Sequence, residues 1–153
     1  MYIKINYKGL YAGLSITYSK QMKGVNSILS DSRHALFWDF DNVDREEVIK
    51  IMLAVQQRWQ LPPIYVLNTG LPKFWHCYCF YAVSYGLALH ILAETPRLDK
   101  AFFKIGVIRG YWTLRYSKKE GRTFTTDIIL PSIYYETVTP NELSILRYWT
   151  KRL

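Results

Sequence analysis

The sequence predicts an α+β fold, a mostly antiparallel sheet with helices packed against it, in a single domain that spans residues 1–153. Two kinds of pattern predict this class. Short apolar runs such as residues 35–41 and "FWHCYCF" have the length and composition of strands. Longer segments between them repeat apolar residues at helical spacing. A chain of 153 residues is also long enough to bury a hydrophobic core.

The first half of the chain is expected to hold strands and one helix. Residues 1–35 are rich in Tyr, Ser and Lys and are expected to form one or two strands, followed by the strand at 35–41. "DREEVIKIMLAVQQRWQL" then predicts a helix, in which Asp44 and Glu47 form a capping box. The apolar stripe of this helix comprises Val48, Met52, Val55 and Trp59, and Pro62 and Pro63 end it.

The second half alternates strands and helices. "IYVLNTG" and "FWHCYCF" read as a hairpin, with Gly70 and Pro72 at its turn. Residues 81–94 predict a buried helix that Pro96 ends. "GYWTLRYSKKEG" predicts a strand running into a basic turn, and "TFTTDIIL" another strand. "TPNELSILRYWTKRL" predicts a closing helix, with Thr139 as its cap, Pro140 in the first turn and Glu142 completing a capping box.

Composition excludes a membrane-spanning protein and favours the cytoplasm. No apolar run reaches the roughly 18 residues that a membrane span needs, and the N-terminus lacks a signal-peptide core. We therefore expect an intracellular, cytoplasmic protein with no membrane partner. Cys77 and Cys79 lie one residue apart in a predicted strand, where a disulfide would be strained, so we interpret them as buried thiols in a reducing compartment.

Charge favours a polyanionic partner. The chain has 20 basic and 12 acidic residues, a net charge of +8. The basic residues between positions 97 and 122 are Arg97, Lys100, Lys104, Arg109, Arg115, Lys118, Lys119 and Arg122. The aromatic residues among them are Phe102, Phe103, Tyr111, Trp112 and Tyr116. Because basic groups hold phosphates and aromatic rings stack bases, this stretch predicts nucleic-acid or nucleotide binding; the alternative is a merely solvated basic surface.

Two carboxylates interrupt the apolar strand "LFWDFDN". Side chains alternate along a strand, so Asp39 and Asp41 point to the same side and repel each other. Either water solvates them at the strand end or a cation lies between them, and paired hard oxygen ligands suit Mg²⁺ or Mn²⁺. His76 shares a strand face with Tyr78 and Phe80, where it is either a functional residue or a hydrogen-bonded structural one.

The order of these motifs resembles the archaeo-eukaryotic primase superfamily, the primase-polymerases. The first motif of that family, apolar residues followed by D-x-D, is matched by Phe37-Trp38-Asp39-Phe40-Asp41. The second, a strand with a small hydroxyl residue, glycine and then histidine, is matched by Thr69, Gly70 and His76. The third is matched by Leu98-Asp99, and a downstream arginine, serine and lysine by Arg115, Ser117 and Lys118. Asp127 is a rival third carboxylate, since Asp99 could simply begin a helix.

The resemblance implies an RRM-like core that synthesises primers in DNA replication by metal-dependent nucleotidyl transfer. It implies a two-metal site of Mg²⁺ or Mn²⁺, with Asp39, Asp41 and Asp99 as catalytic metal ligands. It assigns nucleotide contacts to Thr69, His76, Arg115, Ser117 and Lys118. The implied partners are a single-stranded DNA template, nucleoside triphosphates and a helicase or other replication protein, and a virus or plasmid could encode such a chain.

Two alternatives remain open at this point. One is a non-catalytic protein that binds single-stranded nucleic acid in replication, on a degenerate primase scaffold. The other is a rolling-circle replication nuclease, which usually needs two histidines around one hydrophobic residue. "WHCYC" supplies only one histidine.

Overall fold

The computed structural model describes the backbone of residues 2–7, 10–15, 19–116 and 124–151, and the side chains of residues 23–116 and 124–145. The described part contains three α-helices, and every strand pair in it is antiparallel. The α+β class and the mostly antiparallel sheet are therefore confirmed. Two of the predicted site residues, Ser117 and Lys118, lie outside the described residues.

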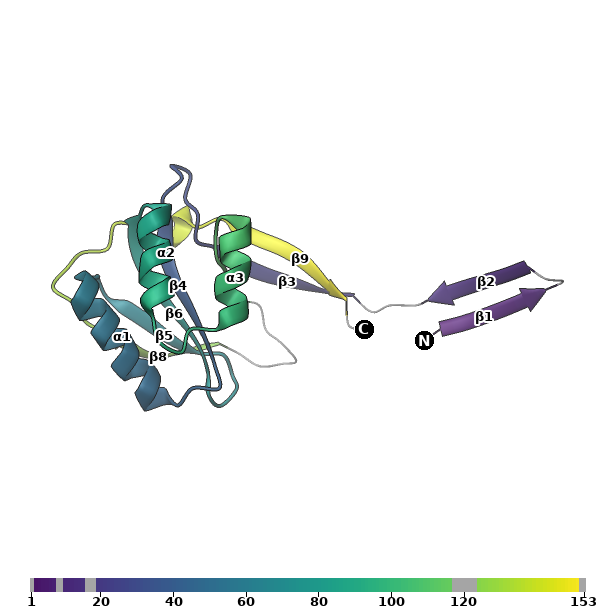
Figure 1. Cartoon of the computed structure of the whole chain (residues 1–153), viewed down its shortest axis with the longest axis horizontal. Helices are drawn as coiled ribbons and strands as arrows, with labels where there is room; N and C mark the ends of the chain where they lie inside the picture. Colours follow the sequence, from purple (N-terminus) through teal and green to yellow (C-terminus); the bar gives the residue numbers. More distant parts are fainter. Residues whose placement is uncertain (1, 8–9, 16–18, 117–123, 152–153) are drawn as a thin grey trace.

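A four-stranded sheet forms the centre of the fold (Figure 1). Its strands lie in the order β4 (His34–Asp41), β6 (Phe74–Val83), β5 (Ile64–Asn68) and β8 (Thr125–Leu130). The expected hairpin is present, because β5 pairs with β6 in antiparallel register. β4 and β8 are the outer strands of this sheet, so the carboxylates of "LFWDFDN" lie on an edge strand.

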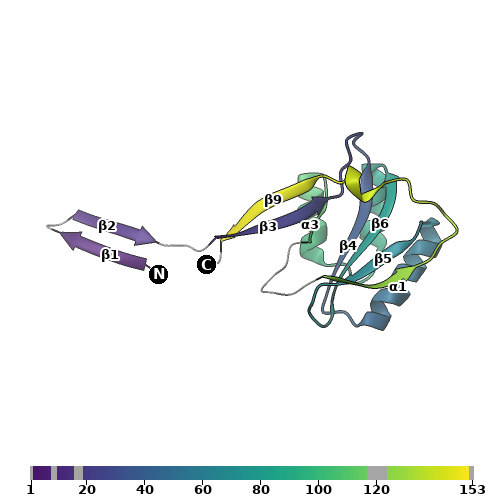
Figure 2. The same ribbon diagram turned by 180° about the vertical axis from the view of Figure 1, so that it is seen from behind.

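The other strands form two smaller sheets. β3 (Ser19–Asn26) lies between β7 (Thr113–Arg115) and β9 (Ile145–Lys151), and the paired β3 and β9 run side by side in both views (Figures 1 and 2). β1 (Tyr2–Tyr7) and β2 (Leu10–Ser15) form a hairpin with each other. The described part of residues 1–35 thus holds three strands and the start of β4, where one or two strands were expected.

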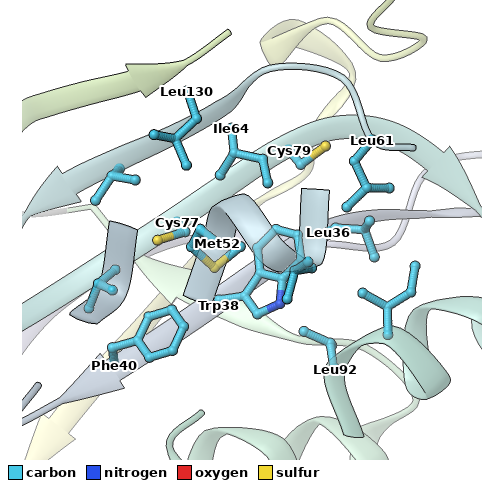
Figure 3. Close-up of a cluster of buried hydrophobic side chains, with 14 of the residues drawn as sticks. Leu36, Trp38, Phe40, Met52, Leu61, Ile64, Cys77, Cys79, Leu92 and Leu130 are labelled. Atoms are coloured by element: carbon cyan, nitrogen blue, oxygen red, sulfur yellow. The ribbon is translucent and has the colours of Figure 1, made fainter. Parts of the chain in front are cut away.

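Alternation along β4 sends its side chains into two different cores. Leu36, Trp38 and Phe40 are fully buried on the side covered by the helices, together with Met52 of α1 (Figure 3). Phe37 is buried in a second cluster on the opposite side of the sheet. The face assignment made from the sequence is confirmed, and it puts Asp39 and Asp41 on the side away from the main core.

The helix α1 (Arg45–Trp59) forms where the apolar stripe predicted it, but its capping box does not. Val48, Met52 and Val55 are buried, as expected. Asp44 occupies the N-cap position without accepting a side-chain capping hydrogen bond. Its carboxylate pairs instead with Lys73, with Nζ and Oδ1 3.1 Å apart, because the β5–β6 turn brings a cation within reach.

Two helices follow β6, where the sequence predicted a single helix at residues 81–94. Strand β6 extends to Val83, which pairs with His34, so α2 (Tyr85–Glu94) begins later, after the cap Ser84. The structure then adds α3 (Lys100–Arg109), which begins at the N-cap Asp99 and ends at Gly110, with φ 78°. Such a positive φ is accessible to glycine at little cost.

The predicted closing helix is wrong. The capping signals are real but support only the short 3₁₀ turn η1 (Pro140–Glu142), in which the Glu142 carboxylate accepts hydrogen bonds from the N–H and hydroxyl of Thr139. Residues 145–151 form β9, which pairs with β3 over seven residues. Their sequence, "ILRYWTK", is rich in residues that favour strands, and an available partner strand outweighs the local helix signal.

Cys77 and Cys79 are both buried and unpaired, as expected. Among the described residues, no helix has both the length and the apolar character that a membrane crossing requires.

Candidate carboxylate site on strand β4

Asp39 and His76 lie directly opposite each other on neighbouring strands. Their Cα atoms are register partners in the β4–β6 pair, and His76 Nε2 lies 3.5 Å from Asp39 Oδ1. The His76 side chain is buried, whereas a quarter of the Asp39 side chain is exposed. Asp39 and His76 therefore project from the same face of the sheet.

Asp99 reaches the same strand from outside the sheet. Its backbone N–H donates to the carbonyl oxygen of Asp39 at 2.9 Å, which places it against the free edge of β4. Its Oδ1 accepts a hydrogen bond from the backbone N–H of Phe102 at 2.6 Å and so caps α3. Asp99 can therefore both begin helix α3 and be the third carboxylate, because the N-cap position of this helix lies beside Asp39.

Asp127, the rival third carboxylate, lies on the far side of the sheet. It belongs to β8, which is the edge strand opposite β4. Its Oδ2 lies 2.7 Å from Nε of Arg45, in an ion pair between β8 and the start of α1. The geometry favours Asp99 over Asp127 as the neighbour of the D-x-D pair.

The local field acts strongly on Asp39. Burial, followed by the negative charges of Asp41 and Asp99, raises the pKa of Asp39 to about 7. The positive charge of Arg115 opposes this shift. The carboxyl group of Asp39 therefore holds a proton close to neutral pH unless a cation takes the proton's place.

His76 is shifted in the opposite direction. Burial and then the nearby charge of Arg115 lower the pKa of His76 to about 3, and the backbone of Arg115 offsets this only in part. His76 is therefore neutral at pH 7. Its Nδ1 has no hydrogen-bond partner within the described residues, and its ring lies 5.2 Å from that of Phe124.

Arg115 supplies the positive charge of the site. Its guanidinium carbon lies 5.9 Å from the centroid of the Phe124 ring, and its buried Nε has no partner among the residues that the structure describes. Thr69, the remaining described nucleotide-contact candidate, uses its hydroxyl within the β5–β6 turn, where it donates to the carbonyl oxygen of Phe74 at 3.2 Å. Thr69 thus has a structural task of its own.

The donor chemistry of Asp39, Asp41 and Asp99 fits a hard divalent cation, because all three offer carboxylate oxygens and together they disfavour the ionised form of Asp39. Within the described ranges, however, no three His, Cys, Asp or Glu side chains are arranged closely enough to hold a metal ion. The capping bond of Asp99 occupies only one of its two oxygens.

The sequence did not predict the pocket that lies beside Asp41. It has a volume of about 670 Å³ and lies between the end of β4, the end of α2 and the start of α3. Its charged lining residues are Asp41, Asp99, Arg97, Lys100 and Lys104. Lys100 and Lys104 belong to the basic stretch, but only helix α3 places them at this pocket. The sequence pattern did not predict that helix beyond the possibility that Asp99 begins one.

Two aromatic residues of the basic stretch pack in the protein interior instead of offering a face on which bases could stack. Trp112 is 1% exposed and belongs to the main core, and Phe102 packs against both clusters. A groove of about 290 Å³ on the sheet face away from the helices is lined by Tyr65, Tyr78 and Phe80, joined by Tyr116 from the basic stretch. Alternation in "FWHCYCF" was the signal for Tyr78 and Phe80, which share the face of His76.

Comparison of the chain with protein-family models, with curated proteins and with solved structures finds no match. The likeness to primase-polymerases therefore rests on the motifs in the sequence.

Proposed function

We propose that the chain is a DNA-directed nucleotidyltransferase that makes or extends primers on a single-stranded template. One observation carries the proposal: the edge strand β4 carries Asp39 and Asp41, the backbone N–H of Asp99 donates to the carbonyl oxygen of Asp39 at 2.9 Å, and His76 Nε2 lies 3.5 Å from Asp39 Oδ1. Stability alone does not favour such a cluster of acids, whereas metal-dependent phosphoryl chemistry requires one. The β-α-β-β-α succession from β4 to α2, with β6 between β4 and β5, matches the split β-α-β unit of an RRM-like core, whereas β8 joins this sheet beside β5 and not beside β4.

In this proposal Asp39 and Asp41 bind Mg²⁺ or Mn²⁺ from one face of β4, and the carboxylate of Asp99, which lies beside Asp39, moves toward them as the ion binds, since the three groups are not close enough to hold it in this structure. A bound divalent pair would position the attacking hydroxyl and neutralise the leaving pyrophosphate. The neutral His76 contributes hydrogen bonding without adding charge, since its pKa is about 3. Arg115 contributes a fixed positive charge next to these acids, suited to phosphate oxygens.

The test is nucleotide incorporation on primed and unprimed single-stranded templates with Mg²⁺ or Mn²⁺. Asp39→Asn and Asp41→Asn keep the side-chain size but remove the charge, so we expect incorporation to fall by about 100-fold or more. Asp127→Asn is the matched control, because Asp127 lies at the opposite sheet edge in a partly exposed ion pair with Arg45. Wild-type rates in both site variants would contradict the proposal.

A second candidate function is binding of single-stranded nucleic acid without catalysis. Its specific support is the aromatic groove, in which the rings of Tyr65 and Phe80 lie 5.3 Å apart and those of Tyr78 and Phe80 are nearly parallel. Aromatic faces stack unpaired bases without regard to sequence. Tight binding of an oligonucleotide in EDTA, weakened by Phe80→Leu, with no incorporation in any metal, would favour this candidate.

A further inference from the structure

Helix α3 exposes a row of apolar side chains to solvent. Ala101, Ile105 and Ile108, here called the α3 stripe, are spaced four and then three residues apart, so they lie on one side of the helix. All three are exposed, Ile105 by 46% and Ile108 by 85%. Exposed apolar residues are ordinary when they stand singly, whereas a continuous row of them marks a surface that another molecule can cover.

The opposite side of α3 is already occupied. Gly106 is buried against the indole ring of Trp112, and Phe102 packs against both core clusters. α2 lies next to α3 (Figure 1), and the hydroxyl group of Tyr85 in α2 donates to the carbonyl oxygen of Val107 at 3.4 Å. Packing within the chain therefore explains the inner side of this helix but not the α3 stripe.

Helix α1 shows what a solvated helix side looks like in this fold. Its exposed residues carry charges of both signs and include Glu46, Glu47, Lys50 and Arg58. The exposed residues of α3 are all apolar or basic, and none is acidic. A helix side that faces only water is expected to resemble that of α1.

Three basic residues border the α3 stripe. Lys100 and Lys104 lie along one side of it and Arg109 along the other, as the helical period of 3.6 residues requires. None of the three takes part in an ion pair within the described part of the chain. An apolar row between two positive borders is complementary to an amphipathic helix whose own apolar side is bordered by Asp or Glu.

The same charges disfavour other occupants of this surface. A second copy of the chain would bring identical basic borders together, and each copy has a net charge of +8. A nucleic acid offers phosphates to the borders but does not match an apolar row of Ile105 and Ile108. Helices that bind membranes carry Trp, Phe or Leu on their apolar side, whereas the α3 stripe has two isoleucines and one alanine.

We propose that α3 is a docking surface for an acidic amphipathic helix of another protein. The apolar side of the partner helix packs on Ile105 and Ile108, and its acidic borders lie against Lys104 and Arg109. The inference goes beyond the proposed function, because the α3 stripe contains no residue of the carboxylate site.

A library of displayed helical peptides tests this inference on the full chain. Each peptide has about 18 residues, enough to form a helix, with a fixed row of leucines and with the bordering positions randomised among Glu, Lys, Gln and Ser. We expect selection to enrich Glu at the borders. Ile108→Ser should weaken the selected peptides about tenfold, because it removes apolar contact area. Leu53→Ser is the matched control, since Leu53 is a 45% exposed residue of α1, and it should leave binding unchanged.

Reversing the charge of the borders gives a second readout. Lys104→Glu with Arg109→Glu should change the enriched border residue from Glu to Lys, which a loss of folding cannot produce. Equal melting temperatures of the wild type and the variants verify that all of them fold.

Several results would overturn the proposal. These are failure to enrich any peptide, enrichment without a preference for Glu, and equal binding by the wild type and Ile108→Ser. Self-association that Ile108→Ser removes, measured by analytical ultracentrifugation, would assign the α3 stripe to a second copy instead. Binding to phosphatidylserine vesicles or to a single-stranded oligonucleotide that Ile108→Ser abolishes would assign it to a membrane or to nucleic acid.

Discussion

Asp39 and His76 show how one environment shifts two neighbouring groups in opposite directions. Burial disfavours the charged form of each, so it raises the pKa of the acid and lowers that of the base. Asp41 and Asp99 add to the shift of Asp39, and Arg115 adds to that of His76. Between the two shifted values, near pH 5, both side chains are neutral, and their 3.5 Å contact is not an ion pair.

The first prediction is a pH-dependent effect of Asp39→Asn on stability in metal-free buffer. The folded state holds the Asp39 proton more tightly than the unfolded state, because its folded pKa is about 7. The stability that this proton contributes is complete below about pH 4 and is lost as the pH rises through 7. The wild type should therefore lose up to about 4 kcal/mol relative to Asp39→Asn between pH 4 and pH 8.

Urea unfolding of both proteins across this pH range measures the difference. His76 has the opposite sign, since its lowered pKa favours the folded state above about pH 6.5, but its shift comes from burial and Arg115 and so cancels in the comparison. Mg²⁺ added at pH 8 should restore stability to the wild type alone. A pH-independent difference would show that the Asp39 carboxylate is well solvated.

At the scale of elements, α3 depends on a close approach between Gly106 and Trp112. Gly106 is the buried position of this helix, and a Cβ atom built there would overlap the indole ring of Trp112. Trp112 is itself almost fully buried and stacks with Tyr85. The glycine therefore lets α3, whose first residue lines the pocket, lie against the main core.

The second prediction concerns this contact. Gly106→Ala should destabilise the protein by about 1–3 kcal/mol in denaturant unfolding, because the added methyl group forces the indole or the helix to move. Gly86→Ala in α2 is the control, since nothing lies within 4 Å of the position that a Cβ atom would take there, and it should be neutral or stabilise by up to about 1 kcal/mol. Equal effects of the two substitutions would show that the contact with Trp112 is loose.

At the scale of the whole molecule, the positive charge is distributed over more than one surface. The chain carries a net charge of +8, and the described basic residues include Lys100 and Lys104 at the pocket and Arg115 at the carboxylate site. Aromatic rings on the sheet face lie apart from α3. A single strand that contacts both regions would have its phosphates held in one place and its bases stacked in another.

The third prediction is that binding to single-stranded DNA weakens steeply with salt. If about four phosphates are contacted, affinity should fall about 50-fold between 50 and 200 mM salt, because bound counterions are released. Fluorescence anisotropy of a labelled oligonucleotide measures this. An oligonucleotide of the same sequence with a neutral backbone is the control and should show a flat response. A flat response from the charged strand would mean that the basic residues only solvate the surface.

Much of the candidate site was predictable because it depends on local alternation. The period of two along a strand puts Asp39 and Asp41 on one face and His76 on the face of Tyr78, whatever the rest of the chain does. The cross-strand meeting of Asp39 with His76 then needed only correct pairing of β4 with β6. The choice between Asp99 and Asp127 was not predictable, since it depends on which strand occupies which edge.

By itself the sequence determined the α+β class, the strands β4, β5, β6 and β8, the apolar stripe of α1 and the shared faces of the site residues, because these follow from patterns of two to four residues. Tertiary structure alone decided that residues 145–151 are a strand, that Asp44 pairs with Lys73 rather than capping α1, and that Asp99 lies beside Asp39. Each of these depends on a partner far away in the sequence. Local propensities differ by only about 1 kcal/mol, so such a partner outweighs them.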